Sequence, residues 1–199
     1  MRKLIVLLAA IVTLGVTAGA AQAQGHVAIL MPGRGGAVPV DFLVRNQSRI
    51  ESAGIRTIVT TSPSQAVSIS RAETGKGSKV VIVGMSLGVT HAASALASGA
   101  KVSGAVFVSG VYGAARSNLG SPSRLPATLM IHHAADQCRF TTPEIARSFA
   151  QWSGGKATIR WINNSGVARG QPCGPRGAHG FFMQDGAAVS AMTGFIKSR

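Results

Sequence analysis

The sequence predicts an α/β protein, a three-layer sandwich in which helices cover both faces of a mostly parallel sheet of about six strands. Short apolar segments recur along the chain without the polar–apolar alternation of a half-exposed sheet. Segments with helical spacing or rich in helix formers separate them, as βαβ units require. The length of 199 residues suffices for one domain with a substantial core and is too short for two.

The first 23 residues are expected to lie outside this fold. Arg2 and Lys3 precede an apolar stretch, Leu4–Val16, and Ala21-Gln22-Ala23 has the small-residue pattern of a signal-peptidase site. The apolar stretch is too short for a membrane span. We therefore expect residues 1–23 to be a cleaved signal peptide and residues 24–199 to form a single domain. Because no cysteine follows the cut to carry a lipid, the protein is expected to be periplasmic or secreted.

Six apolar or β-branched segments are predicted as strands. In chain order they are His26–Met31, Arg56–Thr60, Lys79–Val83, Val102–Val108, Ala127–Ile131 and Ala157–Ile162. The third has four consecutive β-branched residues after its lysine, and such side chains favour strands. In an open parallel sheet, function gathers at the carboxyl ends of the strands, so the loops that leave these ends are the candidates for a site.

Helices are predicted between most of these strands. The segments are Val38–Ala53, Pro63–Glu73, the Ala-rich run after Gly88, Pro143–Ser153 and Asp185–Lys197. Pro143 suits the first turn of its helix, with Thr141 or Thr142 as the N-cap. Ser109–Pro126 is rich in Gly, Ser and Arg and is predicted as a loop. It is too short to form a covering domain, so we expect a shallow, open site.

The central segment carries the pattern G-x-S-x-G as Gly84-Met85-Ser86-Leu87-Gly88. The bare pattern is weak in a chain this rich in glycine and serine, but here it follows a predicted strand and opens a predicted helix. That context is typical of a nucleophile elbow, a turn so sharp that the serine hydroxyl stands clear of both elements. Gly84 and Gly88 suit the positions where neighbouring backbone leaves no room for a side chain. Ser86 is therefore the candidate nucleophile.

A serine nucleophile needs a histidine to take its proton and a carboxylate to hold that histidine. Behind a nucleophile elbow these occur in the chain order Ser, acid, His. Three acidic residues follow Ser86. Glu144 lies at the start of a predicted helix, where a carboxylate is favoured by the helix dipole and needs no catalytic role. Asp185 has no histidine after it. Once the order is accepted, Asp136 and then His179 complete the predicted triad.

Three further motifs carry a family resemblance. Gly177-Ala178-His179-Gly180-Phe181 matches the pattern G-x-H-G-F, and residues 132–136 match H-G-x-x-D, with His133 in place of the glycine. Residues 31–34 resemble an H-G-x turn, with proline in place of the histidine. With the elbow, these segments make the chain similar to compact, lidless bacterial esterases and dienelactone-hydrolase-like proteins of the α/β-hydrolase superfamily. The resemblance covers most of the mature chain.

The resemblance implies a minimal α/β-hydrolase fold and an oxyanion hole formed by the backbone N–H groups of Arg34 and Leu87. Dienelactone hydrolases carry cysteine as the nucleophile, so Ser86 favours ester cleavage. The resemblance thus implies hydrolysis of a small ester by an acyl-enzyme mechanism that needs no cofactor. Acyl transfer and the hydrolysis of thioesters, lactones or peptides would use the same three residues.

Cys138 and Cys173 are the two cysteines of the chain. In an oxidising compartment a disulfide is the expected state. It would tie the loop of Asp136 to the loop of His179. The alternative is a pair of buried or metal-binding thiols, but no ligand spacing supports it. No metal site is predicted, because the adjacent His132 and His133 would point to opposite sides of a strand.

The chain is strongly basic, with 20 Lys and Arg against six Asp and Glu. Removing Arg2 and Lys3 leaves 18 basic residues and a net charge of +12. The basic residues are scattered, with no run interleaved with aromatics, so nucleic acid is not an expected partner. Loose association with anionic envelope surfaces is expected instead. Arg34, Arg116 and Arg124 are predicted to give the site a positive rim. A second hypothesis is a non-catalytic hydrolase-fold protein that binds an anionic envelope polymer or a protein partner.

Overall fold

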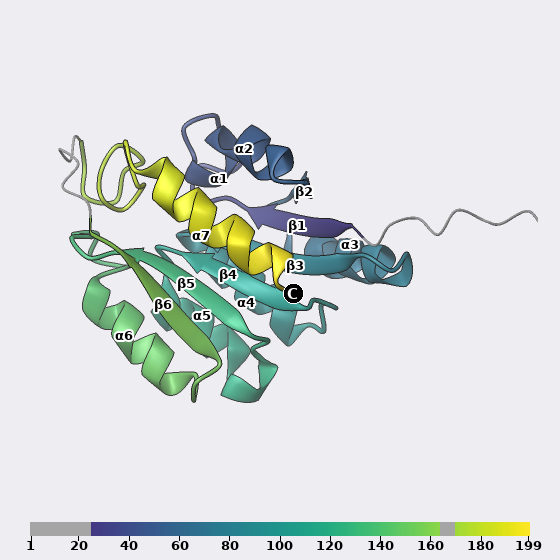
Figure 1. Cartoon of the computed structure of the whole chain (residues 1–199). Helices are drawn as coiled ribbons and strands as arrows, with labels where there is room; N and C mark the ends of the chain where they lie inside the picture. Colours follow the sequence, from purple (N-terminus) through teal and green to yellow (C-terminus); the bar gives the residue numbers. More distant parts are fainter. Residues whose placement is uncertain (1–24, 164–169) are drawn as a thin grey trace, which may run out of the picture.

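A computed structural model describes residues 25–163 and 170–199. The expected signal peptide and its cleavage site lie outside these described residues. Figure 1 shows three layers, with helices on both sides of one twisted sheet. The predicted α/β class is confirmed. Among the described helices, none combines the length and the apolar character needed to cross a lipid bilayer.

The sheet has six strands in the order β2-β1-β3-β4-β5-β6, and every pairing is parallel. The strands are β1 (His26–Met31), β2 (Ile55–Val59), β3 (Lys79–Met85), β4 (Gly104–Val108), β5 (Thr128–His133) and β6 (Ala157–Ile162). Successive residues of a strand point to opposite faces. In β3, Val80 and Ile82 enter one core while Val81 and Val83 enter the other. This burial on both faces explains why the central strands lack polar alternation.

Two groups of helices cover the sheet. One face carries α1 (Phe42–Arg45), α2 (Gln47–Ser52) and α7 (Asp185–Lys197), and α7 crosses in front of the sheet in Figure 1. The other carries α3 (Pro63–Gly75), α4 (Leu87–Ala97), α5 (Tyr112–Leu119) and α6 (Pro143–Trp152). A single 3₁₀ turn, η1 (Pro122–Arg124), precedes β5.

The strand order reverses direction at β1. The chain leaves β1 toward β2 on one side and returns through α3 to β3 on the other side. Right-handed crossovers in opposite directions place their helices on opposite faces, which separates α1 and α2 from α3. The resulting crevice between the carboxyl ends of β1 and β3 is where open α/β sheets bind ligands. Ser86 follows β3 at this point.

Four of the predicted strands, β2 to β5, differ from the observed ones by one or two residues at one or both ends. Two predictions outside the strands were wrong in kind. The single helical segment expected at 38–53 is two short helices that meet at Asn46. The first begins only at Phe42, because the Asp41 side chain accepts from the N–H of Leu43 and caps α1 there. The loop expected at 109–126 contains α5 and η1. Tyr112, Ala115 and Leu119 are buried at helical spacing, and this apolar stripe was hidden among Gly, Ser and Arg.

Candidate active site

Ser86 occupies a strained turn between β3, which ends at Met85, and α4, which begins at Leu87. Its φ of 53° and ψ of −114° lie in a region that residues other than glycine rarely adopt. The backbone is held on both sides, because the Ser86 N–H donates to the Val108 carbonyl at 2.9 Å and the Ser86 carbonyl accepts from Val111 at 3.1 Å. The half-buried side chain is thus fixed at the crevice.

The two glycines of the elbow meet backbone from other elements. A Cβ at Gly88 would lie 1.9 Å from the carbonyl oxygen of Met31, and one at Gly84 would lie 2.7 Å from the carbonyl oxygen of Gly88. Real Cβ atoms essentially never approach backbone this closely, so neither position can hold a larger residue without moving the turn. The spacing of G-x-S-x-G is therefore explained by the packing of α4 against β1 and β3.

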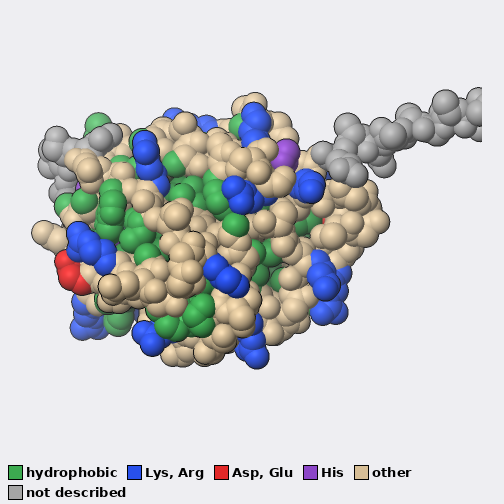
Figure 2. Space-filling model, turned by 60° about the horizontal axis from the view of Figure 1, so that its bottom comes forward, with side chains coloured by type: hydrophobic (Ala, Val, Ile, Leu, Met, Phe, Trp, Pro, Cys, Tyr) green, Lys and Arg blue, Asp and Glu red, His purple; other side chains and the backbone are tan. Residues whose placement is uncertain are grey.

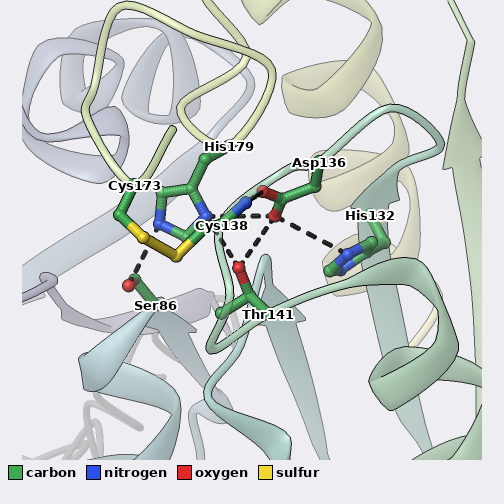
Figure 3. Close-up of a disulfide and its surroundings, with 7 residues drawn as sticks. All are labelled: Ser86, His132, Asp136, Cys138, Thr141, Cys173 and His179. Carbon is green, nitrogen blue, oxygen red and sulfur yellow. Dashed lines mark hydrogen bonds and ion pairs between the residues drawn. A yellow bond between two sulfur atoms is a disulfide. The ribbon is translucent and has the colours of Figure 1, made fainter. Parts of the chain in front are cut away.

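The structure brings together the three side chains predicted as a triad (Figure 3). His179 Nε2 lies 3.1 Å from Ser86 Oγ, and His179 Nδ1 lies 3.0 Å from Asp136 Oδ2. Asp136 comes from the loop after β5 and His179 from the loop before α7. Both are almost fully buried. An ionised carboxylate can only accept, so Nδ1 carries the proton and Nε2 presents its lone pair to the serine hydroxyl.

Asp136 is held by donors at both oxygens. The N–H of Cys138 donates to Oδ1 at 2.9 Å, and the hydroxyl of Thr141 donates to Oδ2 at 2.9 Å. The ring of His132 lies farther away, with Nε2 3.7 Å from Oδ2. Burial lowers the pKa of His132 to about 4, despite the nearby Asp136 charge, so this imidazole is neutral near pH 7. The fully buried His132 ring packs between Tyr112 and Trp161.

The predicted disulfide between Cys138 and Cys173 is present and joins residues 35 apart in sequence. Cys138 is the residue whose N–H binds Asp136, and Cys173 lies six positions before His179. The bond therefore links the two loops that carry the acid and the histidine, as Figure 3 shows. Cys173 also borders the cavity at Ser86.

The turn after β1 lies against the serine. A Cβ at Gly33 would stand 3.4 Å from the Cβ of Ser86. The Gly33 N–H donates to Asp41 Oδ2 at 2.9 Å, which fixes this turn. In the described part of the chain, the next N–H, that of Arg34, finds no acceptor, nor does that of Leu87 at the start of α4. An unsatisfied N–H at a helix start is a ready donor to an anion.

Asp41 was not singled out from the sequence. It caps α1 and holds the turn at Gly33, and burial raises the pKa of this carboxyl group, although the N–H groups of Gly33 and Leu43 oppose the shift. A sequence signal was available, because an Asp directly before the apolar pair Phe42-Leu43 is a typical N-cap. The short length of the helix concealed it.

A cavity of about 150 Å³ opens at Ser86 and His179. Its apolar wall is formed by Val38, Val40, Phe42 and Met85, and Arg34 and Asp41 also line it. Of the arginines predicted at the rim, only Arg34 borders this cavity.

The other two rim arginines lie elsewhere, so that part of the prediction was wrong. Arg124 donates to the Leu119 carbonyl in the turn before β5, at the amino edge of the sheet. Arg116 lies over the ring of Trp152, at the far end of α6. Charge counts from the sequence could not assign these side chains to an edge of the sheet.

Arg45, which was not singled out from the sequence either, links three segments around the site. Its guanidinium donates to the carbonyls of Val40 and Gly180 and pairs with Asp185 at 2.7 Å. Val40 lines the cavity, and Gly180 follows His179. One side chain from α1 thus joins the loop after β1 to the histidine loop and to the start of α7.

His132 and His133 point to opposite sides, as expected from adjacent strand positions. His133 Nε2 lies 2.9 Å from Gln184 Oε1, and its Nδ1 accepts from the N–H of Ala135. His133, which replaces a glycine of the resemblance motif, therefore binds its own loop to the start of α7. Within residues 25–163 and 170–199, no group of three or more His, Cys, Asp or Glu side chains is placed to hold a metal ion.

Several solved structures are similar to this chain. An esterase from Exiguobacterium antarcticum superposes with a TM-score of 0.62 at 11% identity, over 87% of this chain and 92% of that chain. A Pyrococcus furiosus esterase gives 0.62 at 10% identity, over 88% and 82%. A Xanthomonas campestris protein described as a hydrolase of the α/β superfamily gives 0.60 at 16% identity, over 88% and 100%.

No protein-family model and no curated protein matches this sequence. The similarity is therefore one of structure at low sequence identity. At such identities a structural match shows the fold and not the activity. The parallel sheet, its strand order and the long superpositions agree with the resemblance drawn from the motifs. The chain has the α/β-hydrolase fold.

Proposed function

We propose that this protein is an exported serine hydrolase that cleaves carboxylic esters through an acyl-enzyme intermediate. The observation that carries the proposal is the continuous line of hydrogen bonds from Ser86 through His179 to Asp136, which starts at a strained elbow. Esterases among the similar structures add support at the level of the fold.

In the proposed mechanism, His179 Nε2 takes the proton of Ser86 as Oγ attacks the ester carbonyl carbon. The carbonyl oxygen becomes an oxyanion and accepts from the N–H groups of Arg34 and Leu87. Each such donor is commonly worth about 10²–10³ in rate. The tetrahedral intermediate collapses, the leaving alcohol takes the proton from His179, and the acyl group stays on Ser86. A water deprotonated by His179 then releases the acid.

The surroundings of Ser86 favour a small substrate. The cavity of about 150 Å³ has a largely apolar wall from Val38, Val40, Phe42 and Met85, which suits a short acyl chain. Arg34 at its edge adds a positive charge that would favour esters with an acidic group nearby. Metal or cofactor chemistry has no role in the proposed steps.

Export is part of the proposal. The N-terminal sequence has the three regions of a signal peptide. The disulfide supports the same interpretation, because structural disulfides persist in oxidising compartments. The mature protein would begin at Gln24 and function in the periplasm or outside the cell.

A panel of aryl esters with acyl chains from acetate to octanoate tests the activity. We expect hydrolysis that is fastest for the short chains and falls by roughly 10³-fold or more in Ser86→Ala and His179→Ala. His91→Ala, on α4 at a residue that does not line this cavity, is the matched control and should keep the wild-type rate. A Ser86→Ala protein that hydrolyses the panel as fast as the wild type would refute the proposal.

The alternative function is binding of an anionic envelope polymer without turnover. The net charge of the expected mature chain favours it, and Figure 2 shows Lys and Arg side chains dispersed over one face with little Asp or Glu among them. A binder would attach to anionic envelope fractions, lose that attachment at high salt and leave every ester intact. Hydrolysis that depends on Ser86 would exclude it.

A further inference from the structure

Thr141 lies inside the candidate triad without belonging to it. Its hydroxyl oxygen is 2.9 Å from Asp136 Oδ2 and 3.0 Å from His179 Nδ1, so it touches both partners of the acid–histidine hydrogen bond (Figure 3). The residue is fully buried. A hydroxyl in such a place must satisfy its hydrogen bonds within the protein, because water cannot reach it.

The protons can be assigned from the three atoms that meet here. The hydroxyl has one proton and two neighbours, and the Asp136 carboxylate can only accept. If the hydroxyl donated to His179 Nδ1, the imidazole proton would sit on Nε2 and face Ser86, where a base is required. When the Thr141 hydroxyl instead donates a hydrogen bond to Asp136 Oδ2, His179 Nδ1 keeps its own proton. The Thr141 oxygen and Asp136 Oδ2 then both present lone pairs to the proton on His179 Nδ1.

This arrangement has a consequence for the reaction. When His179 takes the proton of Ser86, the ring becomes a cation, and Nδ1–H faces two oxygen acceptors in a buried site. Hydrogen bonds to a charged group are about twice as strong as those between neutral groups. The Thr141 hydroxyl therefore favours the productive tautomer before proton transfer and the imidazolium after it.

The backbone holds the hydroxyl in place independently of substrate. The N–H of Thr141 donates to the carbonyl of Cys138 at 2.9 Å, and Cys138 is fixed by its disulfide. Thr142, the next residue, caps α6 with its own side chain. The Thr141 backbone is thus anchored between the disulfide and α6, and its side chain is directed toward the acid and the histidine.

We propose that Thr141 is a positioning residue that acts with Asp136 to hold the tautomer and the orientation of His179. The inference rests on the proposed function, since it assigns Thr141 a part in the same reaction. It goes beyond the three predicted residues, because it assigns a role to a fourth side chain that contacts both partners of the acid–histidine hydrogen bond.

Three variants test it. Thr141→Val keeps the shape and removes the hydroxyl, Thr141→Ser restores it, and Thr142→Val changes only the neighbouring helix cap. With an aryl ester, we expect kcat of Thr141→Val to fall about 10- to 100-fold with KM within about twofold of the wild type, from the loss of one charge-assisted bond. Thr141→Ser should recover most of kcat. Thr142→Val should lower the melting temperature and leave kcat unchanged.

NMR of ¹⁵N-labelled histidine provides a readout independent of turnover. The wild type should hold the His179 proton on Nδ1, and Thr141→Val should show a mixture of the two tautomers. An unchanged kcat and an unchanged tautomer in Thr141→Val would overturn the inference, as would equal losses in the valine and serine variants. The two proposals can also fail separately. If the wild type has no esterase activity but its His179 proton is on Nδ1 and leaves that atom in Thr141→Val, the proposed function is refuted and the positioning role stands.

Discussion

Replacing both half-cystines by serine, Cys138→Ser/Cys173→Ser, removes the covalent link between the loops of Asp136 and His179. The link closes a loop with a sequence separation of 35. For a loop of that length, the chain-entropy relation gives about 13 cal/mol/K, or about 4 kcal/mol at 25 °C. Since domains are commonly stable by about 5–15 kcal/mol, this is a large share of the total.

The expected loss can be measured by urea unfolding and by heating. With an m-value of about 2 kcal/mol/M, a loss of about 4 kcal/mol moves the midpoint by about 2 M. The melting temperature should fall by roughly 8–16 °C for a chain of this size. Wild-type protein under a reductant should behave like the double variant, and the double variant should not respond to the reductant.

The same change should affect catalysis at temperatures where the fold persists. The Cys138 N–H donates to Asp136 Oδ1, and the segment that follows Cys173 leads to His179. Without the disulfide, the loop of the acid and the loop of the histidine therefore each lose a restraint. We expect kcat to fall about 10-fold or more, because small misplacements of reacting groups are costly. A loss of unfolding free energy below about 1 kcal/mol together with an unchanged kcat would refute the reasoning.

Three further changes should separate parts of the account. Gly88→Ala should lower the free energy of unfolding by more than about 3 kcal/mol, since its Cβ meets the Met31 carbonyl. The control Gly113→Ala, with open space in α5, should raise it by up to about 1 kcal/mol. Equal effects of the two changes in chemical denaturation would contradict the elbow packing. His132 has a folded pKa of about 4 against 6.5 in the unfolded chain, so between these pH values only the unfolded chain binds the proton and stability falls as pH falls. Urea unfolding of His132→Phe from pH 7 to pH 4 should therefore lose about 3 kcal/mol less than the wild type, and parallel curves would argue against a neutral buried ring. Arg45→Met should cost about 1–3 kcal/mol and also lower kcat/KM, because its guanidinium holds the carbonyl of Gly180 beside His179; a stability loss with unchanged kinetics would limit Arg45 to a structural role.

The sheet was predictable because its signal is local. The continuous apolar run His26–Met31 matches the observed strand, since a strand buried on both faces excludes most polar residues. The edge strand Ala157–Ile162 also matches its prediction, although its exposed positions carry Thr158 and Arg160. The elbow was predictable for the same reason, because the backbone approaches at Gly84 and Gly88 exclude side chains. The helix at 112–119 was missed because three buried residues carry its apolar stripe within a polar, Gly-containing segment.

The supporting residues of the site could not be read from spacing alone. Thr141 was considered only as a helix cap, yet the cap is Thr142, and the one-residue difference turns the Thr141 hydroxyl inward. Asp41 and Arg45 act through contacts with residues 8 and 135 positions away. Such contacts depend on how loops from separate strands meet at one edge, which no local pattern encodes.

The most direct measurement is reaction with a fluorophosphonate followed by peptide mass spectrometry. A serine hydrolase should form one covalent adduct, on Ser86, and His179→Ala should form it far more slowly because the hydroxyl then lacks its base. Folded wild-type protein that stays unmodified, or that carries the adduct on another residue, would contradict the central claim that this hydroxyl is activated by the imidazole beside it.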